Sequence, residues 1–176
     1  MSQPLLILIS GLPGTGKSTL AESLAQRIGA VALSRDQARQ AIGGPLAVLD
    51  RGFTRLPGRY RRGLQEAANR RLEKAVADEL VAGRSVIVEV VADRDIRRRL
   101  HELTQDHGAA IRSIEVTCSD PAELARRLRS RPCDWNQLVA RMSKSYEPPP
   151  SAFVVDSCMT PDEMVRQVVR FVCRQA

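Results

Sequence analysis

The sequence predicts an α/β fold in which helices cover both faces of a five-stranded parallel sheet. Short apolar runs of strand length alternate along the chain with longer stretches of helical period, which is typical of repeated βαβ units. A hydrophobic share of 43% is enough to fill one core. The 176 residues match the size of one domain and no linker divides them, so residues 1–176 are expected to form a single domain.

The elements follow from apolar patterns and from capping residues. Apolar runs rich in β-branched residues predict strands at residues 5–10, 30–34, 85–91, 111–118 and 152–156. Between them, apolar residues at helical spacing predict helices, as in the stripe that recurs every four positions from Leu64 to Leu80. Pro121 and Thr160 are typical residues at helix starts. The predicted helices span residues 17–28, 34–42, 59–82, 94–107, 121–130, 134–146 and 160–174.

Two segments interrupt this alternation. Residues 43–58 contain six glycine and proline residues and are predicted to be a loop, or a short broken helix, on the substrate side of the fold. The run Arg129-Ser130-Arg131-Pro132 interrupts a helical pattern, because a residue that precedes proline disfavours the helical backbone.

Charge and cysteine content restrict the functional classes. The chain has 27 Lys and Arg against 20 Asp and Glu, a net charge of +7. This charge favours an anionic partner such as a nucleotide or a nucleic acid, although a genomic bias toward arginine explains it equally well. Four cysteines without a CxxC pair do not predict a zinc site. The apolar run 5–9 is too short for a signal or a membrane span, so we expect a cytoplasmic protein with reduced thiols.

Residues 11–18 read Gly-Leu-Pro-Gly-Thr-Gly-Lys-Ser and match the phosphate-loop pattern GxxxxGK(S/T). They lie between the first predicted strand and the first predicted helix, where backbone N–H groups and the helix N-terminus bind phosphate. A glycine-rich turn without a ligand is the alternative. We expect ATP and Mg²⁺ as cofactors, with Lys17 catalytic on the β and γ phosphates and Ser18 as the Mg²⁺ ligand. The other expected nucleotide contacts are Gly11, Pro13, Gly14, Thr15, Gly16 and Thr19.

Two acidic residues are expected beside this loop, because ligands of an open parallel sheet bind beyond the carboxyl ends of its strands. Asp36 follows the second predicted strand and would accept the proton of an attacking alcohol, with Arg39 one turn later to hold an anionic group. A helix-capping role is the alternative for Asp36. Glu89 ends the third predicted strand, where it would face Mg²⁺ or the acceptor. A salt-bridged or edge position is its alternative.

Four segments and the acidic strand end at Glu89 carry a resemblance to a known family; the segments are residues 11–19, 34–39, 126–131 and 138–149. On these residues, the chain resembles the P-loop kinases that include the kinase domain of phage-type polynucleotide kinase, the zeta toxins and chloramphenicol phosphotransferase. The resemblance implies a three-layer P-loop NTPase fold, for which we expect the strand order 2-3-1-4-5. The chain departs from the family pattern at the third predicted strand, where relatives often have Asp followed two residues later by Thr or Asn.

The resemblance also implies roles for single residues. Asp36 would be the general base, and Arg39 would contact a phosphate on the acceptor side, where Glu89 is also expected. A lid at about residues 126–137 would close over ATP, with an arginine as phosphate clamp. A solvated, arginine-rich helix face is the alternative for these residues. The candidates are Arg126, expected at the nucleotide, Arg129, expected to be catalytic, and Arg131.

The expected activity is ATP-dependent transfer of the γ-phosphate to an alcohol group. Residues 51–71 carry +6 of the net charge of +7, which would suit the 5′ end of a nucleic acid, as in polynucleotide kinases. An aromatic share of 3% gives no sign of a base-stacking platform. The alternatives are a small-molecule kinase, acting on an antibiotic, a nucleoside or a sugar, and a nucleotide-binding regulatory module without a substrate. No membrane partner is expected.

Overall fold

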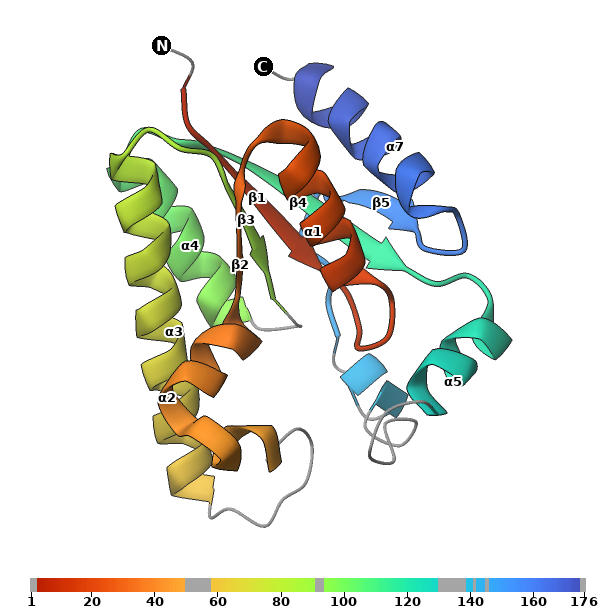
Figure 1. Cartoon of the computed structure of the whole chain (residues 1–176), viewed down its shortest axis with the longest axis horizontal. Helices are drawn as coiled ribbons and strands as arrows, with labels where there is room; N and C mark the ends of the chain where they lie inside the picture. The colour runs from red at the N-terminus through yellow and green to blue at the C-terminus, as the bar shows by residue number, and fades with distance from the viewer. Residues whose placement is uncertain are drawn as a thin grey trace.

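Five parallel strands form one sheet in the order β2-β3-β1-β4-β5 (Figure 1). The computed structural model describes residues 3–49, 58–90, 94–129, 139–140, 142–144 and 146–174. The predicted fold class and strand order are confirmed. The strands are β1 (Leu5–Ser10), β2 (Val31–Ser34), β3 (Val86–Glu89), β4 (Ala110–Thr117) and β5 (Phe153–Asp156).

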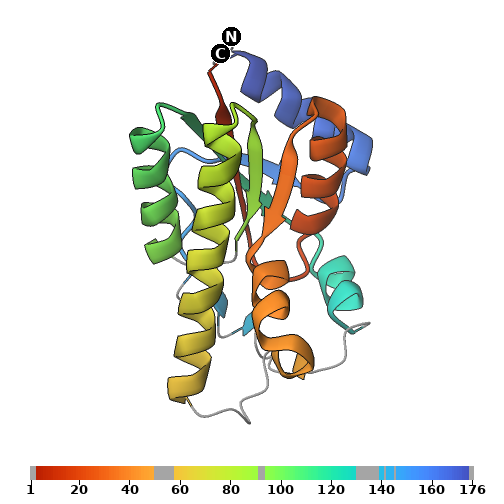
Figure 2. The same cartoon turned by 60° about the vertical axis from the view of Figure 1, so that its left-hand side comes forward.

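Helices lie on both faces of this sheet. Figures 1 and 2 show α1 and α7 on one face and α3 and α4 on the other, while α2 and α5 lie at the end of the sheet where the loop after β1 is found. Among the described helices, none has the length and apolar character needed to cross a membrane. The helices are α1 (Lys17–Ile28), α2 (Arg35–Leu49), α3 (Gly58–Val81), α4 (Arg94–Asp106), α5 (Pro121–Arg129) and α7 (Pro161–Arg174).

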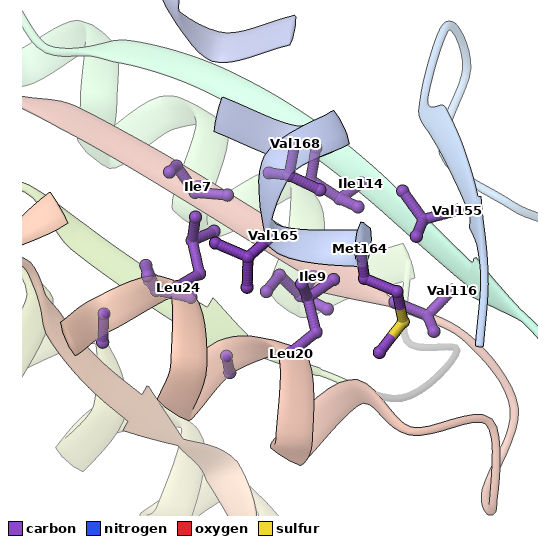
Figure 3. Packing of buried hydrophobic residues seen from close by; sticks show 13 residues of the cluster. Ile7, Ile9, Leu20, Leu24, Ile114, Val116, Val155, Met164, Val165 and Val168 are labelled. Carbon is purple, nitrogen blue, oxygen red and sulfur yellow. The ribbon is translucent and has the colours of Figure 1, made fainter. Parts of the chain in front are cut away.

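The central strand β1 contributes side chains to two separate cores. Ile7 and Ile9 face α1 and α7, where they pack in one cluster with Leu20 and Val165 (Figure 3). Leu6 and its neighbours on the opposite face pack against α3 and α4. Because both faces are buried, the strand is apolar without alternation. Each such side chain contributes about 1.5–3 kcal/mol through burial, so this core fixes the position of the loop that follows β1.

Most predicted boundaries agree with the structure within two residues, but α2 is longer than predicted. The sequence predicts a loop or a short broken helix from residue 43, whereas α2 continues as one helix to Leu49. Gly43, Gly44 and Pro45 disfavour helix locally, glycine by about 1 and proline by about 3 kcal/mol. However, α2 packs along α3, and tertiary packing of this kind outweighs local propensity. The remainder of the predicted loop, residues 50–57, lies outside the described residues.

The helix predicted at 134–146 is described only in part. Residues 139–140 and 142–143 are helical, and residues 134–138 lie outside the described part of the chain. After this helical stretch, Tyr146 anchors the returning chain: its hydroxyl donates a hydrogen bond to the buried carboxylate of Glu115 on β4. Oε2 of Glu115 also accepts a hydrogen bond of 2.8 Å from Ser10, the last residue of β1. Burial and the Glu115 carboxylate raise the pKa of Tyr146, so its hydroxyl keeps its proton.

Candidate functional site

The loop between β1 and α1 can be formed only with glycine at its tightest points. Gly11 has a φ of 143°, and a Cβ there would lie 2.4 Å from the carbonyl oxygen of Val116 on β4. Gly14 has a φ of 86°, and its Cβ would lie 2.8 Å from a methyl carbon of Leu128 on α5. The loop is therefore packed between β4 and α5. Because glycine has no side chain, the backbone N–H groups of Gly11 and Gly14 are not covered by a side chain of their own residue.

Within this loop, the carbonyl of Leu12 accepts two side-chain hydrogen bonds. One comes from Nζ of Lys17 at 2.9 Å and the other from Oγ1 of Thr15 at 2.8 Å. Lys17 is only 4% exposed although it carries a charge. The helix α1 begins at this lysine without a side-chain cap, so its N-terminal N–H groups face the loop, which is the arrangement that binds phosphate.

Glu89 lies beside the loop because β3 pairs with β1 and sets Glu89 opposite Ile9. Its Oε1 accepts a hydrogen bond of 2.9 Å from the hydroxyl of Ser18. Burial raises the pKa of Glu89, and the positive charge of Lys17 opposes this rise. Since β3 lies between β2 and β1, Glu89 does not occupy an edge strand. A carboxylate and a hydroxyl beside a phosphate loop are the oxygen ligands that Mg²⁺ prefers, so these two side chains fit a magnesium site.

Asp36 stands in the first turn of α2, across from the loop. Its backbone N–H donates to the hydroxyl of Ser34 at 3.2 Å, so the side-chain cap of α2 comes from Ser34. The carboxylate of Asp36 is exposed and lines the same cavity as Lys17 and Glu89. Arg39, one turn later, is half-buried and is not among the residues lining this cavity.

These groups surround one cavity of about 570 Å³ at the carboxyl end of the sheet. It joins the phosphate loop to the first turn of α2, to α5 and to the start of α7. Gly11 and Thr15 belong to the same loop, but they are buried and do not line the cavity. Of the residues predicted from the sequence, the cavity brings together Pro13, Gly14, Gly16, Lys17, Ser18, Thr19, Asp36, Glu89 and Arg126.

Two of the arginines of α5 are held by one carboxylate. Glu123 accepts two hydrogen bonds from Arg126, at 2.6 and 2.8 Å, and one from Arg127 at 2.8 Å. These contacts lower the pKa of Glu123 to about 2, with the Arg126 hydrogen bonds as the largest cause. Arg129, at the end of α5, is exposed and does not line the cavity. Residues 130–137 of the predicted lid, including Arg131, lie outside the described residues.

Arg127 lines the cavity, although it is not among the site residues predicted from the sequence. Its guanidinium donates to the hydroxyl and to the carbonyl of Ser157, both at 2.8 Å, just after β5. The side chain of Arg127 is 26% exposed, against 68% for Arg126. Its spacing of four from Glu123 was the available signal, because such pairs face each other on a helix.

Comparisons with known proteins identify a family and a fold for this chain. The family model described as AAA domain (AAA_33) matches residues 6–149. Uncharacterized proteins of Mycobacterium bovis and Mycobacterium tuberculosis are 31% identical over 157 residues, a match that covers 74% of this chain and 30% of theirs. The chain thus spans about 30% of the length of these relatives.

Solved kinase structures share the fold over nearly the whole chain. A putative kinase from Chloroflexus aurantiacus has a TM-score of 0.73 at 23% identity and covers 100% of both chains. A gluconokinase from Sinorhizobium meliloti has a TM-score of 0.69 at 22% identity, covering 100% of this chain and 95% of its own. The APS kinase of Mycobacterium tuberculosis in complex with AMPPNP and APS has a TM-score of 0.69 at 18% identity, covering 98% and 99%. With its phosphate loop and this strand order, the chain belongs to the AAA domain family AAA_33 and has the P-loop nucleotide-binding fold found in kinases.

Proposed function

We propose that this chain is an ATP-dependent phosphotransferase with an alcohol group as acceptor. The observation that carries the proposal is the composition of one cavity, which holds the phosphate loop, Lys17 and Ser18 together with the carboxylates of Asp36 and Glu89. A phosphate loop alone accounts for nucleotide binding. The exposed carboxylate of Asp36 across from it supplies what transfer to an alcohol requires, a base for the acceptor proton.

In the proposed reaction, the loop N–H groups and Lys17 bind the β and γ phosphates and stabilise the charge that develops during transfer. Asp36 accepts the proton of the acceptor hydroxyl as its oxygen attacks the γ-phosphorus and the bond to the β-phosphate oxygen breaks. Ser18 and Glu89 would hold Mg²⁺, which neutralises charge on these phosphates when bound. Arg126 and Arg127 lie on the α5 side of the cavity, where their charge favours a triphosphate.

For the acceptor, the proposal favours a small hydroxylated molecule. Its support is that solved structures with this fold include a sugar kinase, a gluconokinase and an APS kinase. A second candidate, the 5′-hydroxyl end of a nucleic acid as in polynucleotide kinases, is favoured by the basic segment 51–71. Within it, Arg59, Arg62 and Arg71 are exposed on α3.

A transfer screen with γ-labelled ATP separates these acceptors. It would include sugars, nucleosides, hydroxylated antibiotics, and DNA and RNA oligomers with 5′-hydroxyl ends. Product on small molecules only supports the first candidate. A nucleic acid kinase should instead label oligomers, and its affinity for them should fall at least about tenfold between about 50 and 200 mM salt. Slow ATP hydrolysis without any labelled product would contradict both and would leave a nucleotide-binding module.

Asp36→Asn tests the role of the base directly. The variant should bind ATP as before and transfer phosphate about a hundredfold to ten-thousandfold more slowly, because the acceptor proton has no carboxylate to receive it. The matched control is Asp78→Asn, which changes an exposed aspartate on α3 that pairs with Lys74, and which should keep normal turnover. Near-normal turnover of Asp36→Asn would show that Asp36 is not the base.

A further inference from the structure

Two cysteines meet at the end of the sheet, next to the proposed nucleotide cavity. Thr117 at the end of β4 pairs with Asp156 at the end of β5, and Cys118 and Cys158 lie in the turns that follow these strands. Their Sγ atoms are 3.7 Å apart. Cys158 is exposed and Cys118 is half-buried, so one thiol is open to solvent and the other lies behind it.

The carboxylate of Asp156 holds the two turns together. Its Oδ1 accepts hydrogen bonds from the backbone N–H groups of Ser119 and Cys158, both at 3.1 Å. The hydrogen bonds to Ser119 are the largest cause of a lowered pKa of Asp156, about 2, so the carboxylate is ionised at neutral pH. In addition, the N–H of Ser157 donates to the carbonyl of Thr117 at 2.9 Å. These hydrogen bonds fix the backbone around the two sulfurs and hold them close together. Little further ordering of the chain is needed when the S–S bond forms.

The same turn reaches the phosphate loop. Ser157, directly before Cys158, lines the cavity and accepts both hydrogen bonds from Arg127. A Cβ at Gly16 would lie 3.2 Å from the Cβ of Ser157, so this serine is in contact with the loop at the start of α1. Ser157 thus connects Cys158 to Arg127 and to the phosphate loop.

From this geometry we propose that Cys118 and Cys158 are a reversible oxidation site, at which a hydroperoxide converts the two thiols into a disulfide and weakens nucleotide binding. The thiolate of Cys158 attacks the peroxide, which forms a sulfenic acid and releases one water. Cys118 then attacks that sulfur, the S–S bond forms and a second water leaves. The two thiols lose two electrons and two protons in total, and the peroxide is reduced to water or, for an organic peroxide, to water and an alcohol.

The order of attack follows from exposure. Burial, together with the neighbouring Cys158, raises the pKa of Cys118, so Cys118 is protonated while the exposed thiol reacts first. Closing the bond brings the sulfurs from 3.7 Å to about 2.05 Å. That movement pulls on the turn that carries Ser157, which is why we expect the Arg127 contacts to change.

The first experiment maps the disulfide. Cys173 is exposed on α7 and Cys133 lies outside the described residues, so the test protein carries Cys133→Ser and Cys173→Ser. Treatment with hydrogen peroxide should remove two hydrogen masses, protect both thiols from alkylation and yield a peptide that joins Cys118 to Cys158. A dithiol reductant should reverse all three changes. The control adds Cys118→Ser and should stop at the sulfenic acid of Cys158. Sulfinic acid at Cys158 without a joined peptide in the test protein would overturn the proposal.

The second experiment measures a fluorescent ATP analogue on the reduced and the oxidised test protein. We expect the Kd to rise at least about fivefold on oxidation and to recover on reduction. An unchanged Kd with a mapped disulfide would overturn the effect on the nucleotide. This second part rests on the proposed function, but the peptide map does not, and failure of the reduced protein to bind the analogue would count against the proposed function alone.

Discussion

At the scale of single residues, Glu89 shows a conflict between stability and function. Its carboxylate is largely buried beside the loop, and burial raises its pKa, which means that the folded chain without nucleotide disfavours the charge. We expect Glu89→Gln to raise the free energy of unfolding of the nucleotide-free protein by about 1 kcal/mol, because the amide still accepts from Ser18 without a buried charge. The same change should abolish Mg²⁺-dependent phosphate transfer.

Urea unfolding of the two proteins without nucleotide, followed by transfer assays, checks this prediction. The control is Glu102→Gln, which changes an exposed glutamate that pairs with Arg98 on α4 and should leave both measurements nearly unchanged. A lower free energy of unfolding for Glu89→Gln would mean that contacts in the folded protein stabilise the charged carboxylate more than its raised pKa implies.

The pKa of Asp156 is shifted in the opposite direction to that of Glu89. Its pKa lies at about 2, below the ordinary 3.8, because Ser119 and Cys158 donate to its ionised form. The stabilisation is therefore fully present above the unfolded pKa and is lost as pH falls through the folded pKa. We expect Asp156→Asn to lower the free energy of unfolding by about 1 kcal/mol at neutral pH, after allowance for solvent screening.

The measurement is the difference between the two unfolding free energies as a function of pH. It should be constant above the ordinary pKa of 3.8 and shrink toward the folded value of about 2. A difference that stays constant down to that acidity would show that the charge of Asp156 contributes nothing.

At the scale of helices and strands, the sequence predicts well wherever a strong local pattern and the tertiary environment agree. The phosphate loop and α1 were predicted at the bounds that the structure has, because an apolar strand, a glycine pattern and an amphipathic helix follow one another. Where local and tertiary preferences conflict, as at Pro45 in α2, the packing of α2 on α3 decides, and no single-sequence pattern contains it. The contact between Arg127 and Ser157 was not predictable for a related reason, because the two residues are distant in the sequence.

Gly63 in α3 makes a test at this scale. It lies in the helix, and apart from its chain neighbours and the helix backbone no described atom would lie within 4 Å of a Cβ at this position. Alanine at this position should raise the free energy of unfolding by about 0.5–1 kcal/mol, because glycine loses more backbone freedom on folding. Thermal or urea unfolding measures the change. Gly14→Ala is the contrasting variant, since its Cβ would meet Leu128 at 2.8 Å, and it should lower stability. A lower free energy of unfolding for Gly63→Ala would show that other atoms of the folded chain fill the space beside Gly63.

At the scale of the whole molecule, the parallel sheet and the position of the cavity at its carboxyl end were predictable from alternating strands and helices and from one phosphate loop. The strand order was expected only from the resemblance to P-loop kinases. The network of Ser10, Glu115 and Tyr146 was not predictable, because it joins the end of β1, the middle of β4 and the chain before β5. A buried glutamate inside a strand is a signal that a partner exists, but only the fold identifies it.

Tyr146→Phe tests this connection. Without its hydroxyl, the buried carboxylate of Glu115 keeps only the Ser10 donor among these contacts, so the free energy of unfolding should fall by about 1–2 kcal/mol. Tyr60→Phe is the control, because Tyr60 is 44% exposed on α3 and its hydroxyl should be dispensable. Equal stability of the two variants would mean that water replaces the Tyr146 hydroxyl in the network.

The contact between Gly11 and the carbonyl of Val116 has a consequence for the nascent chain. The phosphate loop follows β1 and packs at Gly11 against β4, which ends at Thr117. While β4 is still inside the ribosome, the part of the chain that has emerged therefore contains the entire glycine motif but lacks the strand against which the loop packs. We expect the ability to hold a triphosphate to arise during synthesis only after that strand has emerged and paired, long after the motif itself has been made.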